Sequence, residues 1–415
     1  MSGGSYRWLA GICGSQVLFH LVQQQYAAAL PLLVRDWRMS ASQAGLITSA
    51  FQIGYLISTV TFSALADRFG AGRLYLVAAA GGAVASFLFG GLAHGFVSGL
   101  VLFGLIALFQ GGVYTPALQL ISAEFPPERR GRAMGFYIAS STLGNAASLA
   151  LAGRLIVWAS WRTAFILLAF GPAVGFLVGW LTLRERPKGP PPGRTAQGFS
   201  GAVLRNRPAM GLMAAYTTHS WELLAIRGWV PAFLTVVAGA GGGERAAVGI
   251  GASLSSLFMV VGIISTSVAG TLSDRWGRAT VILVMTGLSG ACSLVFGWMV
   301  GVPLWLVVAV GLLYGFSAIG DSPVLSAGVT EVVPPSHLGS ALALRAALGF
   351  GAGAIAPWVF GVVLDQTNPG AVGTGVGRYH TWGWAFTAMG AVGLSGLLGL
   401  LWVRGDRQEG QDREG

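Results

Sequence analysis

The chain has 415 residues, of which 54% are hydrophobic and only 10% charged, and its mean hydropathy is +0.68. A soluble domain carries roughly 25% charged residues, so this composition excludes a water-soluble globular protein. The formal net charge is +10 at pH 7. The basic residues gather at the ends of apolar segments, so the charge indicates membrane topology rather than binding to nucleic acid. Cys13 and Cys292 lie in apolar segments and predict neither a disulfide framework nor a metal site.

Twelve apolar segments are long enough to cross a bilayer, which takes roughly 20 residues. They cover residues 8–34, 42–66, 74–94, 97–121, 132–156, 162–184, 208–237, 248–272, 279–299, 302–328, 339–364 and 379–403. Seventeen of the 25 Lys and Arg residues fall on one side of this arrangement and six on the other. Because basic residues stay in the cytoplasm during insertion, we expect a protein of the cytoplasmic membrane with both termini in the cytoplasm.

The longest internal hydrophilic stretch runs from Arg184 to Arg207 and contains three consecutive prolines, which predict an irregular linker. It divides the twelve spans into six and six. The sequence therefore predicts an N-terminal six-helix bundle over 1–184, a cytoplasmic linker over 185–207, a C-terminal six-helix bundle over 208–403 and a disordered cytoplasmic tail over 404–415.

The two halves share a repeated pattern. Asp67-Arg68-Phe69-Gly70 and Asp274-Arg275-Trp276-Gly277 lie 207 residues apart, each after the second span of its half, and Glu124 and Glu331 have the same separation. The halves are therefore copies of one six-span unit in parallel orientation. Such a repeat is typical of two-domain secondary transporters.

These motifs make the sequence resemble the major facilitator superfamily, whose loop motif reads Gly-x-x-x-Asp-Arg-x-Gly-Arg-Lys/Arg. The copy from Ser63 to Arg73 has a serine in place of the leading glycine, and the copy from Gly270 to Arg278 lacks only the last basic residue. The resemblance covers nearly the whole chain. It implies an all-α integral membrane protein with twelve transmembrane helices in two pseudo-repeats, alternating access and a monomeric state.

The resemblance also implies a cytoplasmic latch that holds the outward-open state. A carboxylate beside guanidinium groups and a helix N-terminus can join two helices through charge-assisted hydrogen bonds. The alternative is that these charges only mark topology, which does not explain an aspartate beside the arginine in both copies. The latch residues are Asp67, Arg68, Arg73 and Glu124 in the first half and Asp274, Arg275, Arg278 and Glu331 in the second.

Four charged residues fall inside predicted spans, namely Glu222, Arg227, Asp321 and Arg345. A charge at this depth costs at least ~2.5 kcal/mol and by default indicates a functional site. His219 and Glu222 share one helix face and are candidates for proton exchange. Two structural alternatives remain open: a pair of Glu222 with Arg227 or His219, and a salt bridge between Asp321 and Arg345. Arg345 is also a candidate anchor for an anionic substrate.

Uncharged polar side chains occur in spans that the resemblance places around a central cavity. They are His20 and Gln24 in the first span, Gln110 and Tyr114 in the fourth and Tyr314 in the tenth. Each alone is typical of an interhelical contact. Together they predict a polar cavity with some aromatic lining.

The sequence has no motif of a serine hydrolase, a metalloprotease or a phosphate-binding loop, and it has a single lysine, Lys188. We therefore predict no enzyme, no cofactor and no metal. A gradient must drive transport because the sequence has no ATP-binding segment. The expected partners are a lipid bilayer, a small-molecule substrate and a proton.

Two arginines inside the spans favour a small organic anion, or otherwise a polar solute, moved together with a proton, with Glu222 or Asp321 as the proton site. If their acidic neighbours neutralise these arginines, a proton-driven efflux antiporter for hydrophobic or cationic compounds is the alternative. The drug antiporters of the superfamily carry an arginine where Ala107 stands and a Gly-Pro-x-x-Gly-Gly motif where this chain has Gly144-Asn145. Both departures argue against the antiporter, whereas uniport and exchange remain open.

Overall fold

The computed structural model describes residues 3–184, 201–239 and 243–414. These residues form α-helices and short 3-10 turns. The first half contains α1 (Gly3–His20), α2 (Gln25–Asp36), α3 (Ala41–Phe69), α4 (Ala71–Leu92), α5 (Phe96–Glu124), α6 (Pro127–Trp158) and α7 (Trp161–Arg184). The second half contains η1 (Gly201–Arg205), α8 (Arg207–Ala238), α9 (Glu244–Trp276), α10 (Arg278–Phe296), α11 (Leu304–Val332), η2 (Pro335–His337), α12 (Leu338–Thr367), η3 (Pro369–Ala371), η4 (Val376–Arg378) and α13 (Gly383–Glu414).

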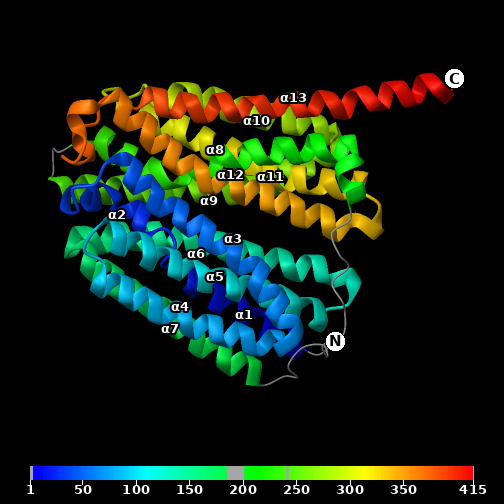
Figure 1. Cartoon of the computed structure of the whole chain (residues 1–415), viewed down its shortest axis with the longest axis horizontal. Coiled ribbons are helices and arrows are strands. Elements are labelled where there is room, and N and C mark those ends of the chain that lie inside the picture. Colours follow the sequence, from blue (N-terminus) through cyan, green and yellow to red (C-terminus); the bar gives the residue numbers. More distant parts are fainter. Residues whose placement is uncertain (1–2, 185–200, 240–242, 415) are drawn as a thin grey trace.

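The helices form two bundles that lie side by side, α1–α7 in one and α8–α13 in the other (Figure 1). Across the divide α3 packs against α12, and α6 packs against α9. Small residues allow this close approach: a Cβ atom at Gly45 of α3 would come 2.8 Å from the carbonyl carbon of Pro357 on α12. Small residues at helix contacts are typical of membrane bundles, where packing must replace the hydrophobic drive.

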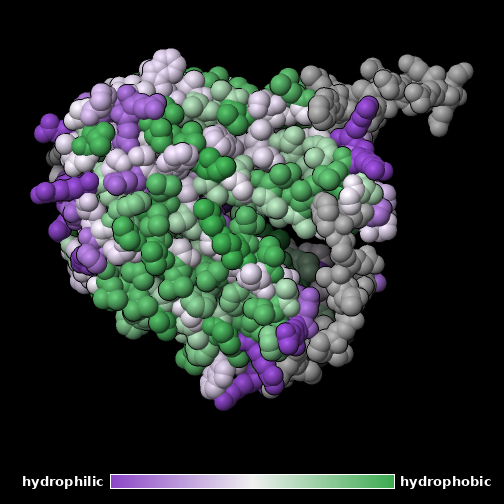
Figure 2. All heavy atoms as spheres, viewed as in Figure 1, coloured by the Kyte–Doolittle hydropathy of each residue, from purple (hydrophilic) through white to green (hydrophobic). Residues whose placement is uncertain are grey.

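Eleven helical segments of the described residues are long and apolar enough to cross a membrane, with α1 and α2 counted as one segment, Ser5–Asp36. Hydrophobic side chains cover the middle of the molecule, and hydrophilic ones gather towards its two ends (Figure 2). The predicted span at 132–156 lies in α6, which is not among the eleven. Its serines and Asn145 make it more polar, and Ser140, Asn145 and Ser148 are buried inside the protein.

The first span predicted at 8–34 lies within the segment Ser5–Asp36, and its helix is interrupted at residues 21–24, between α1 and α2. Neighbouring side chains bond to the backbone groups at the break. Gln110 Nε2 donates to the carbonyl of Phe19 at 3.2 Å, and Ser148 Oγ donates to the carbonyl of Leu21 at 2.6 Å. The same Ser148 Oγ accepts from the backbone N–H of Gln24 at 3.1 Å. A break inside a membrane requires such partners because no water is there to supply them.

Asp365, in the last turn of α12, joins the two bundles. It lies on the side of the molecule away from the C-terminus of α13. Its Oδ1 accepts from the backbone N–H of Ala41 at 2.9 Å and its Oδ2 from that of Ser42 at 2.8 Å, so the carboxylate lies on the N-terminus of α3. Tyr379 donates to Oδ1 at 2.9 Å. Burial and the nearby Asp365 carboxylate raise the pKa of Tyr379, so this hydroxyl keeps its proton.

Two further contacts between the bundles lie at this same end. Arg35 of α2 pairs with Glu244 of α9. Arg245 donates to the backbone carbonyl of Ala159 at 2.6 Å. At the opposite end, towards the C-terminal end of α13, the surface is hollowed between the two bundles (Figure 2).

The predicted disordered tail at 404–415 is wrong, because α13 continues as a helix to Glu414 and projects beyond the bundle (Figure 1). Of the predicted linker, residues 185–200 lie outside the described residues, and Gly201–Arg205 form the turn η1.

We expect Ser148→Ala to destabilise the helix break, because it removes the partner of Leu21 O and of Gln24 N. Leaving buried backbone groups unpaired costs about 1–3 kcal/mol each, so the midpoint of thermal unfolding in detergent falls by several degrees. The matched control is Ser253→Ala, because the Ser253 hydroxyl donates to Gly249 O within its own helix. Equal midpoints for the two variants would contradict the role of Ser148.

Candidate functional site

A cavity of about 360 Å³ lies between the two bundles. Its polar lining is divided: the N-terminal bundle supplies imidazole, amide and hydroxyl groups, and the C-terminal bundle supplies both guanidinium groups. No aspartate or glutamate lines it in the part of the chain that the structure describes. The main lining side chains are His20, Gln23, Gln24, Thr48, Gln52, Tyr55, Tyr114, Ser141, Thr142 and Asn145 from the first bundle and Tyr216, Arg227, Arg345 and Phe350 from the second.

Arg345 of α12 reaches the cavity along the ring of Tyr216. Its guanidinium carbon lies 4.4 Å from the centre of that ring, and one of its NH groups donates to Ser326 of α11. The Nε atoms of Arg345 and Arg227 are buried and have no hydrogen-bond partner among the described residues. The cavity therefore holds two cationic groups with unused donors.

Neither arginine forms the pairs that the sequence left open. A salt bridge between Asp321 and Arg345 is wrong, since Asp321 lies against His219. The physical reason is that α8 packs against both α11 and α12, which places His219 beside Asp321. A pair of Glu222 with Arg227 or His219 is also wrong, because Glu222 bonds to other side chains. The two acids therefore do not neutralise the arginines by direct contact.

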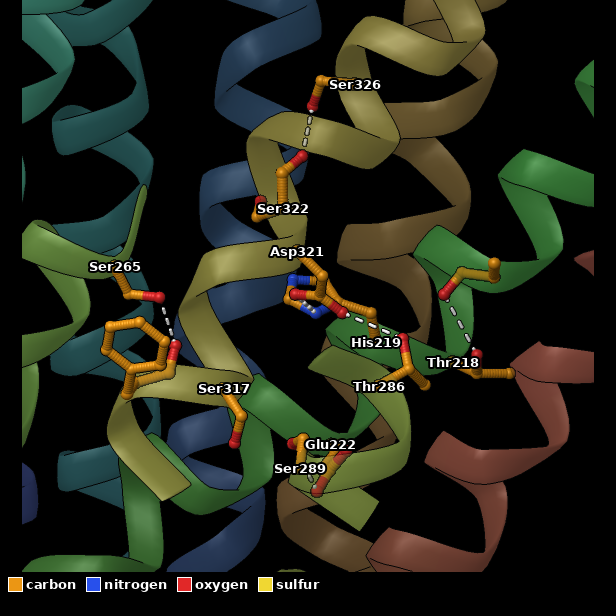
Figure 3. Close-up of polar contacts among 12 residues, drawn as sticks. Thr218, His219, Glu222, Ser265, Thr286, Ser289, Ser317, Asp321, Ser322 and Ser326 are labelled. Atoms are coloured by element: carbon orange, nitrogen blue, oxygen red, sulfur yellow. Dashed lines mark hydrogen bonds and ion pairs between the residues drawn. The ribbon is translucent and has the colours of Figure 1, made fainter. Parts of the chain in front are cut away.

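The acids belong to a second site, the buried polar cluster, which consists of His219, Glu222, Thr286, Ser289, Tyr314 and Asp321. Figure 3 shows all of these side chains except Tyr314. It lies among α8, α10 and α11 inside the C-terminal bundle. His219 Nδ1 lies 2.9 Å from Asp321 Oδ1, and Thr286 donates to Asp321 Oδ2 at 3.2 Å. These side chains point toward one another from three helices.

Glu222 occupies the other end of the buried polar cluster. Its Oε1 accepts from Tyr314 at 2.9 Å and from Ser289 at 3.1 Å. A Cβ atom at Gly393 of α13 would come 2.5 Å from Oε2, so the absence of a side chain there leaves room for the carboxylate. Glu222 is only 3% exposed and does not line the central cavity.

The ten predicted binding residues thus fall into two groups. Those that line the cavity are His20, Gln24, Tyr114, Arg227 and Arg345. Those that do not line it are Gln110, which bonds to the helix break, and His219, Glu222, Tyr314 and Asp321, which lie in the buried polar cluster.

Sequence reasoning missed several lining residues, among them Gln52, Tyr55, Asn145 and Tyr216. Two of them left a signal in the sequence. Asn145 stands in the polar stretch that lowers the hydropathy of α6, and Tyr216 precedes His219 by one helical turn.

The predicted latch residues of the second half come together at the end of α9. Arg278 lies 2.7 Å from Asp274 and donates through Nε to Glu331 at 3.0 Å. Arg275 is exposed beside them. This cluster joins α9, α10 and α11 within one bundle.

The predicted latch residues of the first half are arranged differently. Asp67 accepts from Gln119 at 3.1 Å, and Arg68 lies over the ring of Phe69. Glu124 accepts from Ser5 at 2.8 Å, and Arg73 is exposed. The described contacts do not join these four residues to one another, and their gating role stays a prediction.

Comparison with known proteins decides the family. The family model of the Major Facilitator Superfamily matches residues 12–357 and 231–415. The chain belongs to this superfamily. It is therefore an integral membrane transporter and not an enzyme, and the predicted all-helical fold is confirmed.

Two relatives and one solved structure illustrate the similarity. The chain is 26% identical over 378 residues to the hexuronate transporter of Bacillus subtilis (strain 168), covering 85% of this chain and 86% of that one. It is 23% identical over 390 residues to a probable sulfoacetate transporter of Cupriavidus necator, covering 87% of each. A bacterial homologue of the human lysosomal transporter Spinster, in an inward-facing and unoccupied conformation, has a TM-score of 0.77 at 16% identity and covers 97% of this chain and 98% of that one.

We expect Asp321→Ala to destabilise the transporter, because His219 and Thr286 lose their shared partner. Unpaired buried polar groups cost about 1–3 kcal/mol, which thermal unfolding in detergent detects as a lower midpoint. Ser322→Ala is the matched control, since it removes a hydroxyl from the next, half-buried position of the same helix. A midpoint for Asp321→Ala as high as that of the control would show that the pair adds nothing to stability.

Proposed function

We propose that this transporter moves a small organic anion together with a proton across the cytoplasmic membrane by alternating access. The observation that carries the proposal is the pair Arg227 and Arg345 in a cavity whose described lining has no carboxylate. A guanidinium group binds a carboxylate or sulfonate through two parallel hydrogen bonds. A bound anion supplies the partner that these two charges lack in the protein.

The opposite wall suggests how the rest of the substrate is held. The amide oxygens of Gln23 and Asn145 are buried without a partner among the described side chains. Hydroxyl groups on the substrate would donate to such oxygens. An anion whose carboxylate or sulfonate binds the arginines, and whose hydroxyl groups donate to these amide oxygens, would contact both bundles at once. The two relatives described above are named for organic anions, hexuronate and sulfoacetate, which supports the same class.

The buried polar cluster supports proton coupling. Ionisable groups inside membrane helices are typical of proton relays, and His219 with Asp321 and Glu222 provides three of them in one cluster. Because the cluster does not line the cavity, a proton and an anion can be bound at the same time. Arg227 and Glu222 both lie on α8, so one helix carries parts of both sites.

The contacts between the bundles support an inward-facing conformation. With both termini in the cytoplasm, as the basic residues favour, the contacts of Asp365 and Arg35 close the outer end. The hollow between the bundles then opens to the cytoplasm (Figure 2). A monomer is sufficient for this cycle because both walls of the cavity come from one chain.

Uptake into proteoliposomes tests this function, with D-glucuronate, sulfoacetate and benzoate as probes and with or without an inside-alkaline pH gradient. We expect the gradient to accelerate uptake of at least one of these anions. Arg345→Ala and Arg227→Ala should each lower that uptake about tenfold or more, since a hydrogen bond to a charged group contributes about 1.5–3 kcal/mol.

The matched control for loss of a positive charge is Arg154→Ala, because Arg154 is exposed on α6 and does not line the cavity. This variant should transport like the unaltered protein. Movement of tetraphenylphosphonium against the proton gradient, with no effect of Arg227→Ala or Arg345→Ala, would instead identify an efflux antiporter.

A further inference from the structure

We propose that Tyr216 is the positioning residue that couples the proton of the buried polar cluster to anion binding at Arg345. The inference rests on the proposed function. Tyr216 lies on α8 one turn before His219 and lines the central cavity together with Arg345. It thus touches both sites.

Three successive contacts connect the cavity to the buried carboxylate. The guanidinium carbon of Arg345 lies 4.4 Å from the centre of the Tyr216 ring. The rings of Tyr216 and His219 have centres 5.7 Å apart, with an angle of 38° between their planes. His219 Nδ1 then lies 2.9 Å from Asp321 Oδ1. The path therefore runs from α12 through α8 to α11.

The Tyr216 ring also packs against Gly349, which follows Arg345 by one turn on α12. A Cβ atom at Gly349 would come 2.6 Å from Cε1 of Tyr216, so only a glycine leaves space for the ring in this position. Ser220 lies beside the same glycine. The ring can therefore transmit a change at His219 to Arg345 rather than turn away from it.

Other ionisable groups face this path from the surrounding helices. They are Glu222 and Arg227 on α8, Cys292 on α10, Tyr314 on α11 and Tyr114 on α5. Of these, Glu222 bonds to Tyr314 and Ser289. In the part of the chain that the structure describes, none of these five groups contacts both Arg345 and His219, whereas Tyr216 touches both.

The sign of the coupling follows from charge. An unoccupied Arg345 carries a positive charge that opposes an added positive charge in the buried polar cluster. A bound anion neutralises Arg345 and so favours proton uptake by the buried polar cluster. By linkage, the proton favours anion binding by the same factor. The Tyr216 ring keeps the two positive charges at a fixed separation and keeps water from screening them.

Binding of D-glucuronate to the purified full-length protein at pH 6 and pH 8 tests the inference. We expect the unaltered protein to bind about fivefold or more tightly at pH 6 than at pH 8. Tyr216→Phe keeps the ring and should keep this ratio. Tyr216→Leu removes the ring and should bring the ratio close to one, whatever its affinity at either pH.

A second pair of variants keeps the test independent of how well Tyr216→Leu folds. Gly349→Ala displaces the ring without deleting it and should also reduce the ratio. Gly351→Ala is its matched control on the same helix, because nothing lies within 4 Å of a Cβ atom there; it should keep the ratio.

The two proposals fail in different ways. A full pH ratio in both Tyr216→Leu and Gly349→Ala would overturn the role of Tyr216 and leave the anion site intact. Loss of the ratio in Tyr216→Phe would also overturn it, because the ring would then not be the coupling element. Failure of the unaltered protein to bind D-glucuronate, sulfoacetate or benzoate at either pH would overturn the proposed function and this inference together.

Discussion

Arg227 and Arg345 place two positive charges inside helices that cross the bilayer, where each costs at least ~2.5 kcal/mol on insertion scales. The protein does not cancel them with its intramembrane acids, because Asp321 lies against His219 and Glu222 accepts a hydrogen bond from Tyr314. The charges are accommodated instead by a polar cavity between the two bundles. The cavity therefore has a cationic wall from the second bundle, which supplies both lining arginines, and an amide-rich wall from the first bundle.

The opposite wall depends on a second constraint of the membrane, the need to pair every backbone group. The break between α1 and α2 brings His20, Gln23 and Gln24 to the cavity. Gln110 and Ser148 bond to the backbone at the break and stabilise it. These two side chains are therefore structural, and the residues they expose to the cavity are available for a substrate. In the first bundle, the residues available to contact a substrate thus depend on the break between α1 and α2.

The number and positions of the membrane spans can be predicted from the sequence, because the thickness of the bilayer sets their length. Span length and the repeated Asp-Arg-x-Gly motif were enough to place the helices and to predict the fold that the family match confirms. The sequence cannot predict which helices are neighbours at a given depth. Asp321 and Arg345 were correctly assigned to spans, but α8 packs against both α11 and α12 and changes the pairing. Tyr216 was missed for the same reason, since its importance lies in contacts with two other helices.

The most direct test of the anion site compares pairs of compounds of similar size and shape, one anionic and one neutral. Thermal unfolding of the purified protein in detergent is measured with D-glucuronate against D-glucuronamide and with benzoate against benzamide. A ligand that binds the folded state raises the midpoint, so we predict that a carboxylate raises it and its neutral amide does not. An equal increase with the amide, or an increase only with tetraphenylphosphonium, would contradict an anion site at Arg227 and Arg345.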